Sequence, residues 1–112
     1  MRIAIPIAAG RLSAHFGHCE EFALIDVDVD KKEITHEERV GSPPHQPGLL
    51  PRWLFERGAS VIVAGGMGMR AQQLFTEQDI RVIVGAPTDE PANIVNDLLH
   101  ERLSTGENLC DH

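Results

Sequence analysis

Hydrophobic and polar residues alternate in the first part of the chain with the two-residue period of β-strands. Isoleucines occupy positions 3, 5 and 7, and Ala23, Ile25 and Val27 repeat the alternation further on. An Asp-Lys-Lys turn then precedes a polar run that is typical of an edge strand. These patterns predict antiparallel strands over residues 1–8, 22–30 and 33–40, with a loop at 9–21 and a turn at 30–32.

The second part of the chain alternates short apolar runs with segments of helical period. Three prolines between Gly41 and Gly48 exclude helix and strand there. Gly58 is placed to end a helix, and Thr88 or Asp89 can cap the last one. The pattern predicts helices over residues 49–57, 69–78 and 90–103, and buried strands over residues 60–64 and 81–84.

The order of these elements predicts a single-domain α/β fold. The chain has 112 residues, which suits one domain with one core. Hairpins join the first three strands and helices join the rest, so we expect a five-stranded mixed sheet with helices on its faces. The domain is expected over residues 1–103, followed by a flexible carboxyl-terminal tail over residues 104–112 that contains Cys-x-His.

The composition narrows the classes of partner. Lys and Arg total 10 against 17 Asp and Glu, a net charge of -7, and no basic stripe is present, so nucleic acid is not an expected ligand. No apolar run is long enough to span a bilayer, so no membrane association is expected. Two cysteines are too few for a disulfide scaffold, and the expected compartment is the cytoplasm.

Thiol and imidazole side chains form two clusters that could bind metal. The first cluster is His15, His18 and Cys19, and the second is Cys110 with His112. These ligands suit zinc, copper(I), or iron and molybdenum in sulfide clusters. The spacing differs from that of a zinc finger. The alternatives are surface histidines with a small core cysteine, or a Cys19–Cys110 disulfide, which the expected cytoplasmic location disfavours.

A glycine-rich turn follows the first buried strand of the second part and precedes a helix. It consists of Gly65, Gly66, Met67 and Gly68. Glycines let backbone amides approach a ligand closely, and a helix N-terminus favours an anion. The turn also fits G-x-G-x-x-A, but that dinucleotide signature belongs after the first strand of a larger sheet. An anionic ligand other than a nucleotide is therefore the preferred interpretation.

Several of these motifs resemble one known family. They are Met1-Arg2-Ile3-Ala4-Ile5-Pro6, Ser13-x-His15-Phe16-Gly17, Pro43-Pro44-His45, Pro47-Gly48-x-Leu50-Pro51-x-Trp53-Leu54 and Gly65-Gly66-Met67-Gly68-x-x-Ala71. Together they cover nearly the whole chain, which resembles the dinitrogenase iron-molybdenum cofactor biosynthesis family, small carriers of nitrogenase-type metalloclusters.

The resemblance implies a ribonuclease H-like α/β fold without nuclease chemistry, since Ile3, Ile5 and Ile7 provide no acidic residue on the first strand. It also implies binding and transfer of a preformed iron–sulfur or iron–molybdenum cluster between donor and acceptor proteins, without catalysis. The positions marked by the resemblance are His15, His45, Gly66, Met67 and Gly68. A zinc or copper–molybdenum species is an alternative cargo.

We therefore expect the loop that carries His15 and Cys19, the Gly65–Gly68 turn and His45 to border one pocket. His15, His18, Cys19, Cys110 and His112 are the expected metal ligands. Two chains would together supply four thiols, so a homodimer is one open arrangement. The alternatives of another class are a protein-interaction or regulatory module without metal, a zinc-binding domain, and a small enzyme that acts on a nucleotide.

Overall fold

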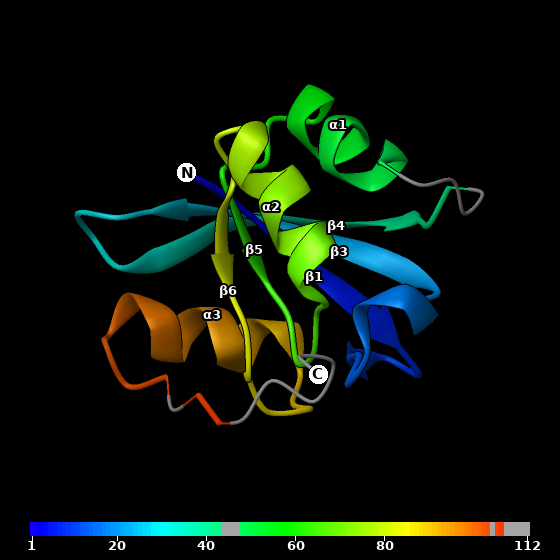
Figure 1. Ribbon diagram of the computed structural model, residues 1–112. Coiled ribbons are helices and arrows are strands. Elements are labelled where there is room, and N and C mark those ends of the chain that lie inside the picture. The colour runs from blue at the N-terminus through cyan, green and yellow to red at the C-terminus, as the bar shows by residue number, and fades with distance from the viewer. Residues whose placement is uncertain (44–47, 104, 107–112) are drawn as a thin grey trace.

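The computed structural model describes residues 1–43, 48–103 and 105–106, and describes His18 by its backbone alone. The chain forms one α/β domain in which a mixed sheet lies between helices (Figure 1). Across the sheet the main strands follow the order β4 (Glu33–Gly41), β3 (Glu21–Asp28), β1 (Arg2–Ala8), β5 (Val61–Val63) and β6 (Arg81–Ile83). Within these described ranges, no helix is long and apolar enough to cross a membrane.

The first part of the chain forms the antiparallel side of the sheet. It contains β1 (Arg2–Ala8), β3 (Glu21–Asp28) and β4 (Glu33–Gly41). β3 pairs with β1 on one side and with β4 on the other. The turn between β3 and β4 is stabilised by Asp28, whose Oδ1 accepts hydrogen bonds from the amides of Asp30 and Lys31. Val29, predicted to lie in the strand, is instead 53% exposed in this turn, because the chain reverses directly after Asp28.

The sheet has six strands rather than the predicted five, because a short strand lies in the segment predicted to be a loop. This strand, β2 (Arg11–Leu12), pairs antiparallel with the end of β1. Ala9 and Gly10 connect the two strands with φ of 54° and 80°. Positive φ at both central residues is the geometry of a tight two-residue hairpin turn. A two-residue strand has no detectable period of its own, so the alternation pattern could not reveal it.

The second part of the chain forms the parallel side of the sheet. Its elements are α1 (Leu49–Glu56), β5 (Val61–Val63), α2 (Met69–Glu77), β6 (Arg81–Ile83) and α3 (Pro91–Leu99). β5 lies parallel to both β1 and β6. The predicted order of strands and helices is therefore observed, with β2 and the one-turn helix η1 (Phe16–His18) added between β1 and β3.

Two apolar cores cover the two faces of the sheet. Side chains alternate between the faces along each strand, so Ile3, Ile5 and Ile7 pack toward α3, whereas Ala4 packs toward α1 and α2. Figure 1 shows the same division, with α3 on one side of the sheet and α1 and α2 on the other. Burial on both faces explains why the central strands are almost wholly apolar.

Each of the three α-helices is followed by a residue in the left-handed conformation, as in a Schellman motif. The position of this residue shows that α3 ends earlier than predicted. After α1 the left-handed residue is Gly58, as predicted, but after α3 it is Glu101, with φ of 57°. The amide of Arg102 donates to the carbonyl of Asp97 at 2.7 Å, which closes the motif. The helix therefore ends at Leu99, not at Leu103. No glycine marks this end, so the apolar period alone suggested a longer helix.

The start of α3 also differs from the prediction. Glu90 is the N-cap residue, and Pro91 occupies the first turn. Asp89 Oδ1 accepts from the Glu90 amide at 2.7 Å and from Asn93 Nδ2 at 3.2 Å. These donors lower the pKa of the Asp89 carboxyl, with the Glu90 amide contributing most. Asp89 thus supports the helix start from one position earlier than the cap.

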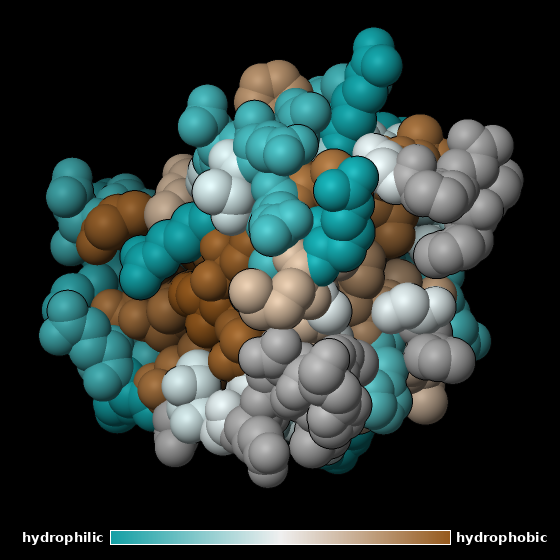
Figure 2. Space-filling view, viewed as in Figure 1, coloured by the Kyte–Doolittle hydropathy of each residue, from teal (hydrophilic) through white to brown (hydrophobic). Residues whose placement is uncertain are grey.

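The two edges of the sheet differ in character. The β4 edge is long and exposes charged residues such as Glu33, Glu38 and Arg39. Charged side chains on an edge discourage pairing with another chain. The β6 edge is only three residues long and is apolar after the exposed Arg81, and Figure 2 shows apolar side chains gathered there between α2 and α3. The predicted edge position of the polar strand is thus observed.

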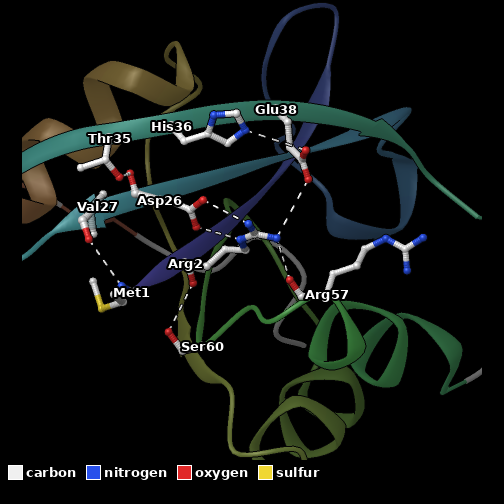
Figure 3. A network of polar contacts seen from close by, with 9 residues as sticks. All are labelled: Met1, Arg2, Asp26, Val27, Thr35, His36, Glu38, Arg57 and Ser60. Atoms are coloured by element: carbon white, nitrogen blue, oxygen red, sulfur yellow. Dashed lines mark hydrogen bonds and ion pairs between the residues drawn. The ribbon is translucent and has the colours of Figure 1, made fainter.

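A network of polar side chains lies at the end of the sheet where β1 begins (Figure 3). Arg2 donates to both carboxylate oxygens of Asp26, at 2.8 and 3.0 Å, and to the carbonyl of Arg57 at 2.8 Å. Glu38 lies 4.0 Å from the same guanidinium, and Ser60 Oγ donates to the Arg2 carbonyl at 3.3 Å. We call these five residues the arginine end.

Candidate functional site

Two loops that are far apart in the sequence lie side by side where β1 and β5 finish. The amide of Gly66 donates to the carbonyl of Ala14 at 2.7 Å, and the amide of Phe16 donates to the carbonyl of Gly66 at 2.9 Å. This pair of bonds makes an isolated parallel bridge between His15 and Gly66. The loop that carries His15 and the glycine turn therefore meet, as the expected pocket requires.

The glycine turn continues this backbone contact toward β6. The amide of Gly85, just after β6, donates to the carbonyl of Gly65 at 2.6 Å, and the amide of Gly106 donates to the carbonyl of Gly85 at 2.6 Å. Residues 13–16, 65–66, 85 and 106 thus lie in adjacent backbone segments. We call this set the glycine end, and it lies opposite the arginine end along β1.

Gly65 approaches its neighbouring loop too closely for a larger residue. A Cβ atom at this position would lie 3.0 Å from the carbonyl oxygens of both Ser13 and Ala14. Gly65 therefore allows the glycine turn to pack closely against the loop that contains Ser13 and Ala14. The expectation that the amides of the turn face an anionic ligand is wrong for Gly66, because Ala14 already accepts its hydrogen bond.

Met67 and Met69 have opposite environments. Met67 is fully buried in the core beneath α1 and α2, so its side chain serves packing, and its thioether does not face a surface ligand. Met69 begins α2 and is 55% exposed. Gly68 is the N-cap residue of α2, and Arg70 follows in the exposed first turn. A helix N-terminus with a basic residue beside it is favourable for negative charge.

Aromatic packing and one buried hydroxyl fix the loop that carries His15. Phe16 packs edge-on against Phe75, with ring centroids 5.5 Å apart, and against Phe22 at 6.3 Å. Ser13 is buried, and its Oγ donates to the carbonyl of His15 at 2.7 Å. His15 itself is exposed between these two anchors. The Ser-x-His-Phe motif therefore presents an imidazole at the surface from a fixed backbone.

Cys19 lies in a pocket of about 230 Å³ beside this loop. The residues that line the pocket are Phe16, Gly17, Cys19, Glu20, Ser42, Pro43 and Leu50. Cys19 Sγ lies 3.9 Å from Ser42 Oγ and donates to it. Burial raises the pKa of the Cys19 thiol above its ordinary value, although the hydrogen bond with Ser42 opposes the shift. A metal that binds this sulfur must therefore displace a proton.

The remaining predicted ligands lie outside the described structure. His45, Cys110 and His112 belong to residues that are not described, and only the backbone of His18 is described. Pro43 and Leu50, which flank the segment containing His45, line the Cys19 pocket. Among the described residues, no group of three His, Cys, Asp or Glu side chains could hold a metal ion. The ligand set therefore stays a prediction.

Family comparison connects this geometry with a class of proteins. Residues 1–101 match the dinitrogenase iron-molybdenum cofactor family. The chain belongs to this family. The motifs that meet at the glycine end, His15-Phe16-Gly17 and the Gly65–Gly68 turn, lie within the matched residues. Membership connects the chain with the handling of the iron-molybdenum cofactor.

Individual relatives support the family and the fold. The sequence is 33% identical over 86 residues to MJ0580, an uncharacterized protein of Methanocaldococcus jannaschii. The aligned region covers 73% of this chain and 72% of that protein. The crystal structure of PH0822 has a TM-score of 0.86 and 25% identity, over 96% of both chains. The apo form of the orange protein from Desulfovibrio gigas has a TM-score of 0.64 and 22% identity, over 96% of this chain and 93% of that one.

Two residues of the site were missed by sequence reasoning. Ser42, the partner of Cys19, follows β4, and its amide donates to the carbonyl of Glu20 at 3.1 Å. Ser42 lies beyond the Glu21–Gly41 pair, next to Glu20 and Cys19, because the register of β3 and β4 shifts between Asp26 and Val27, which the alternation pattern does not reveal. Gly85 also had no signal in the sequence, because its role depends on a contact with Gly106 that lies outside any local pattern.

Proposed function

We propose that this protein is a non-catalytic cytoplasmic carrier that binds a preformed iron–sulfur or iron–molybdenum cluster and passes it from a donor protein to an acceptor protein. The cluster is cargo, held at the glycine end. His15 and Cys19 are the proposed ligands among the described residues, and His18, His45, Cys110 and His112 complete the proposed set. The domain would correspond to the ribonuclease H-like fold that the family resemblance implies.

The observation that carries this proposal is the bridge between His15 and Gly66. It holds the loop that carries the exposed imidazole of His15 against the glycine turn, which leads directly into the N-terminus of α2. The imidazole and the helix N-terminus therefore lie at the same end of the sheet. Imidazole and thiolate are suitable ligands for iron and molybdenum in sulfide clusters. The family of the chain supports the same class of cargo.

Local charge supports an anionic cargo on a protein with a net charge of -7. The overall field of such a protein repels anions, so a binding site needs local compensation. The N-terminus of α2 and the exposed Arg70 in its first turn lie directly after the glycine turn. The positive end of the helix dipole and the guanidinium both favour negative charge at this position.

The environment of Cys19 supports binding rather than nucleophilic catalysis. The hydrogen bond described for its thiol is with the Ser42 hydroxyl, which is not a general base. Burial also raises the pKa of the thiol, which keeps it neutral at pH 7. Because metal binding releases the thiol proton, affinity should increase about tenfold per pH unit below that pKa if Cys19 is the titrating ligand.

Anaerobic reconstitution with iron and sulfide, or with thiomolybdate, tests the proposal. Metal per chain is counted for the wild type, for His15→Ala and for Cys19→Ala/Cys110→Ala, and mass measurement shows whether loading pairs two chains. His36→Ala is the matched control, because His36 is exposed and lies opposite Asp26, at the arginine end of the sheet.

We expect the control to load like the wild type and the other two variants to lose most of the bound metal. Equal loading of wild type and the double cysteine variant would refute the thiol assignment. Zinc alone in protein purified without air would favour the zinc-binding alternative, which needs three or four protein ligands. The absence of any bound metal would favour a protein-interaction module.

A further inference from the structure

Glu20 lines two neighbouring pockets at the same end of the molecule. One is the pocket of about 230 Å³ that contains Cys19. The other, of about 200 Å³, lies beside Ala9 and Gly10 in the turn between β1 and β2. Glu20 is therefore part of the wall of the pocket that contains the proposed thiol ligand.

Three hydrogen bonds fix the position of Glu20. Its amide donates to the carbonyl of Ile7 at 2.8 Å, and its carbonyl accepts from the amide of Ser42 at 3.1 Å. Its side-chain Oε1 accepts from the amide of Ala9 at 2.9 Å. The carboxylate is thus held beside the Cys19 pocket, although Glu20 is an exposed residue.

No cation neutralises this carboxylate within the described part of the chain. No Lys, Arg or His side chain there forms an ion pair with Glu20, whereas the carboxylate of Glu21 lies 3.4 Å from Arg39 Nη1. Glu21 also lies on the α3 face of the sheet, because it alternates with Ala23. Cys19 packs against the core on the opposite face. Of these two carboxylates, Glu20 is the unpaired one on the wall of the thiol pocket.

We infer that Glu20 is a specificity-determining residue of the Cys19 pocket, whose fixed carboxylate disfavours free anions and favours the positive core of an iron–sulfur cluster. This inference rests on the proposed function and narrows its cargo. An iron–sulfide core is positively charged before thiolates bind it, whereas thiomolybdate is a dianion. The α2 side of the glycine end has the opposite charge, from Arg70 and the helix N-terminus, so iron would face Cys19.

Coulomb's law gives the size of the expected effect. Adjacent Cα atoms lie about 3.8 Å apart, so the Glu20 carboxylate lies within about 10 Å of the Cys19 sulfur. At roughly 8 Å in water, one unit charge changes the affinity for a dianion about fivefold and the approach of a monoanion about twofold at low salt. The effect disappears at about 1 M salt, where the Debye length is about 3 Å.

The first test measures the charge at the thiol without any metal. In protein with Cys110→Ser, Cys19 is alkylated by anionic iodoacetate and by neutral iodoacetamide, and the ratio of the two rates cancels the fraction of thiolate. Glu20→Gln removes the charge but keeps an oxygen that can accept from Ala9. We expect the iodoacetate to iodoacetamide ratio to rise about twofold in Glu20→Gln, only at low salt, and to stay unchanged in the control Glu21→Gln. Equal ratios in both variants would overturn the inference.

The second test measures the choice of cargo. Wild type, Glu20→Gln and Glu21→Gln are titrated anaerobically with thiomolybdate, and separately reconstituted with iron and sulfide. The two variants carry the same net charge, so a difference between them depends on position. We expect Glu20→Gln to bind thiomolybdate about fivefold more tightly at low salt, with no gain in bound iron, and Glu21→Gln to behave like the wild type.

The failure of this inference can be distinguished from that of the proposed function. If the wild type binds a cluster but Glu20→Gln binds thiomolybdate no more tightly, the specificity role is overturned and the carrier proposal stands. If the wild type binds neither iron–sulfide nor thiomolybdate, the carrier proposal falls and the specificity role falls with it, even if alkylation shows the charge of Glu20 at Cys19.

Discussion

The two ends of the central strand β1 are closed by different kinds of contact. At the arginine end, charged and polar side chains bind one another: Arg2 contacts Asp26, Glu38 and the carbonyl of Arg57 (Figure 3). At the glycine end, backbone binds backbone, as in the bridge between His15 and Gly66. The side chain of Arg2 makes most of the contacts described at one end, whereas main-chain hydrogen bonds make most of those at the other.

This difference separates a structural end from a candidate site. The functional groups of the arginine end are engaged with each other, so their chemistry is used within the fold. At the glycine end the loops are held by amides and carbonyls, by the Ser13 hydroxyl and by Phe16, and the His15 side chain is exposed. Main-chain closure thus favours ligand binding at that end.

The largest expected change in the free energy of unfolding comes from a substitution that disrupts the glycine end. Gly65→Ala should reduce the free energy of unfolding by about 2 kcal/mol, because the new methyl group meets two carbonyl oxygens of the neighbouring loop. Urea unfolding measures this change. Gly41→Ala is the control and should change the free energy of unfolding by only about a few tenths of a kcal/mol, since Gly41 is exposed at the end of β4 and a Cβ atom there meets nothing within 4 Å. Equal costs would mean that the close approach of the loops contributes little.

The next largest change in the free energy of unfolding comes from a substitution that disrupts the arginine end. Asp26→Asn should cost about 1–2 kcal/mol at pH 7, because it removes a bidentate, charge-assisted contact with Arg2. Urea unfolding measures this cost, and Glu37→Gln at the exposed edge should cost far less.

This prediction includes a pH dependence with a definite sign. The hydrogen bond from Arg2 lowers the pKa of the Asp26 carboxyl in the folded state. A lowered pKa stabilises the fold above the unfolded pKa, near 3.9, and the contribution is lost as pH falls through the folded value. The advantage of wild type over Asp26→Asn should therefore shrink below about pH 4. An advantage that persists unchanged at lower pH would contradict the assignment.

Two serines provide a direct comparison of the ends. Ser13→Ala should cost about 1 kcal/mol, because it leaves the His15 carbonyl without its buried hydroxyl donor. Ser60→Ala, at the arginine end, removes a longer and exposed bond of 3.3 Å to Arg2 and should cost only about a few tenths of a kcal/mol. Thermal unfolding ranks the two variants. Faster amide exchange at Phe16 in the Ser13→Ala protein alone would locate its effect in the loop.

The smallest effect concerns the turn that returns the chain from α3 toward the glycine end. Glu101→Gly should raise the free energy of unfolding by about 0.5 kcal/mol, because glycine adopts the φ of 57° without steric cost. Asp79→Gly, at the equivalent position after α2 with φ of 58°, should give a similar gain. A loss of stability in both variants would show that other contacts of these side chains exceed the backbone strain.

The elements of the fold followed from the sequence more fully than the site did. The alternation around Ile5 and the apolar run at Ile62 placed the main strands correctly, because each pattern is local and repeats. The end of α3 was misplaced because Glu101 adopts a conformation more typical of glycine. At the site, the meeting of His15 with the glycine turn was expected, whereas the amide of Gly66 proved to be bonded to Ala14.

The sequence by itself determined the five main strands and the three α-helices, their order, and the family, because periodicity and motifs lie in consecutive residues. Only the tertiary structure showed which main-chain atoms join the loop after β2 to the glycine turn, and that Gly85 and Gly106 continue this contact. These contacts join main-chain atoms that every residue possesses. Their only trace in the sequence is a glycine where a Cβ atom would not fit, and that trace does not name its partner.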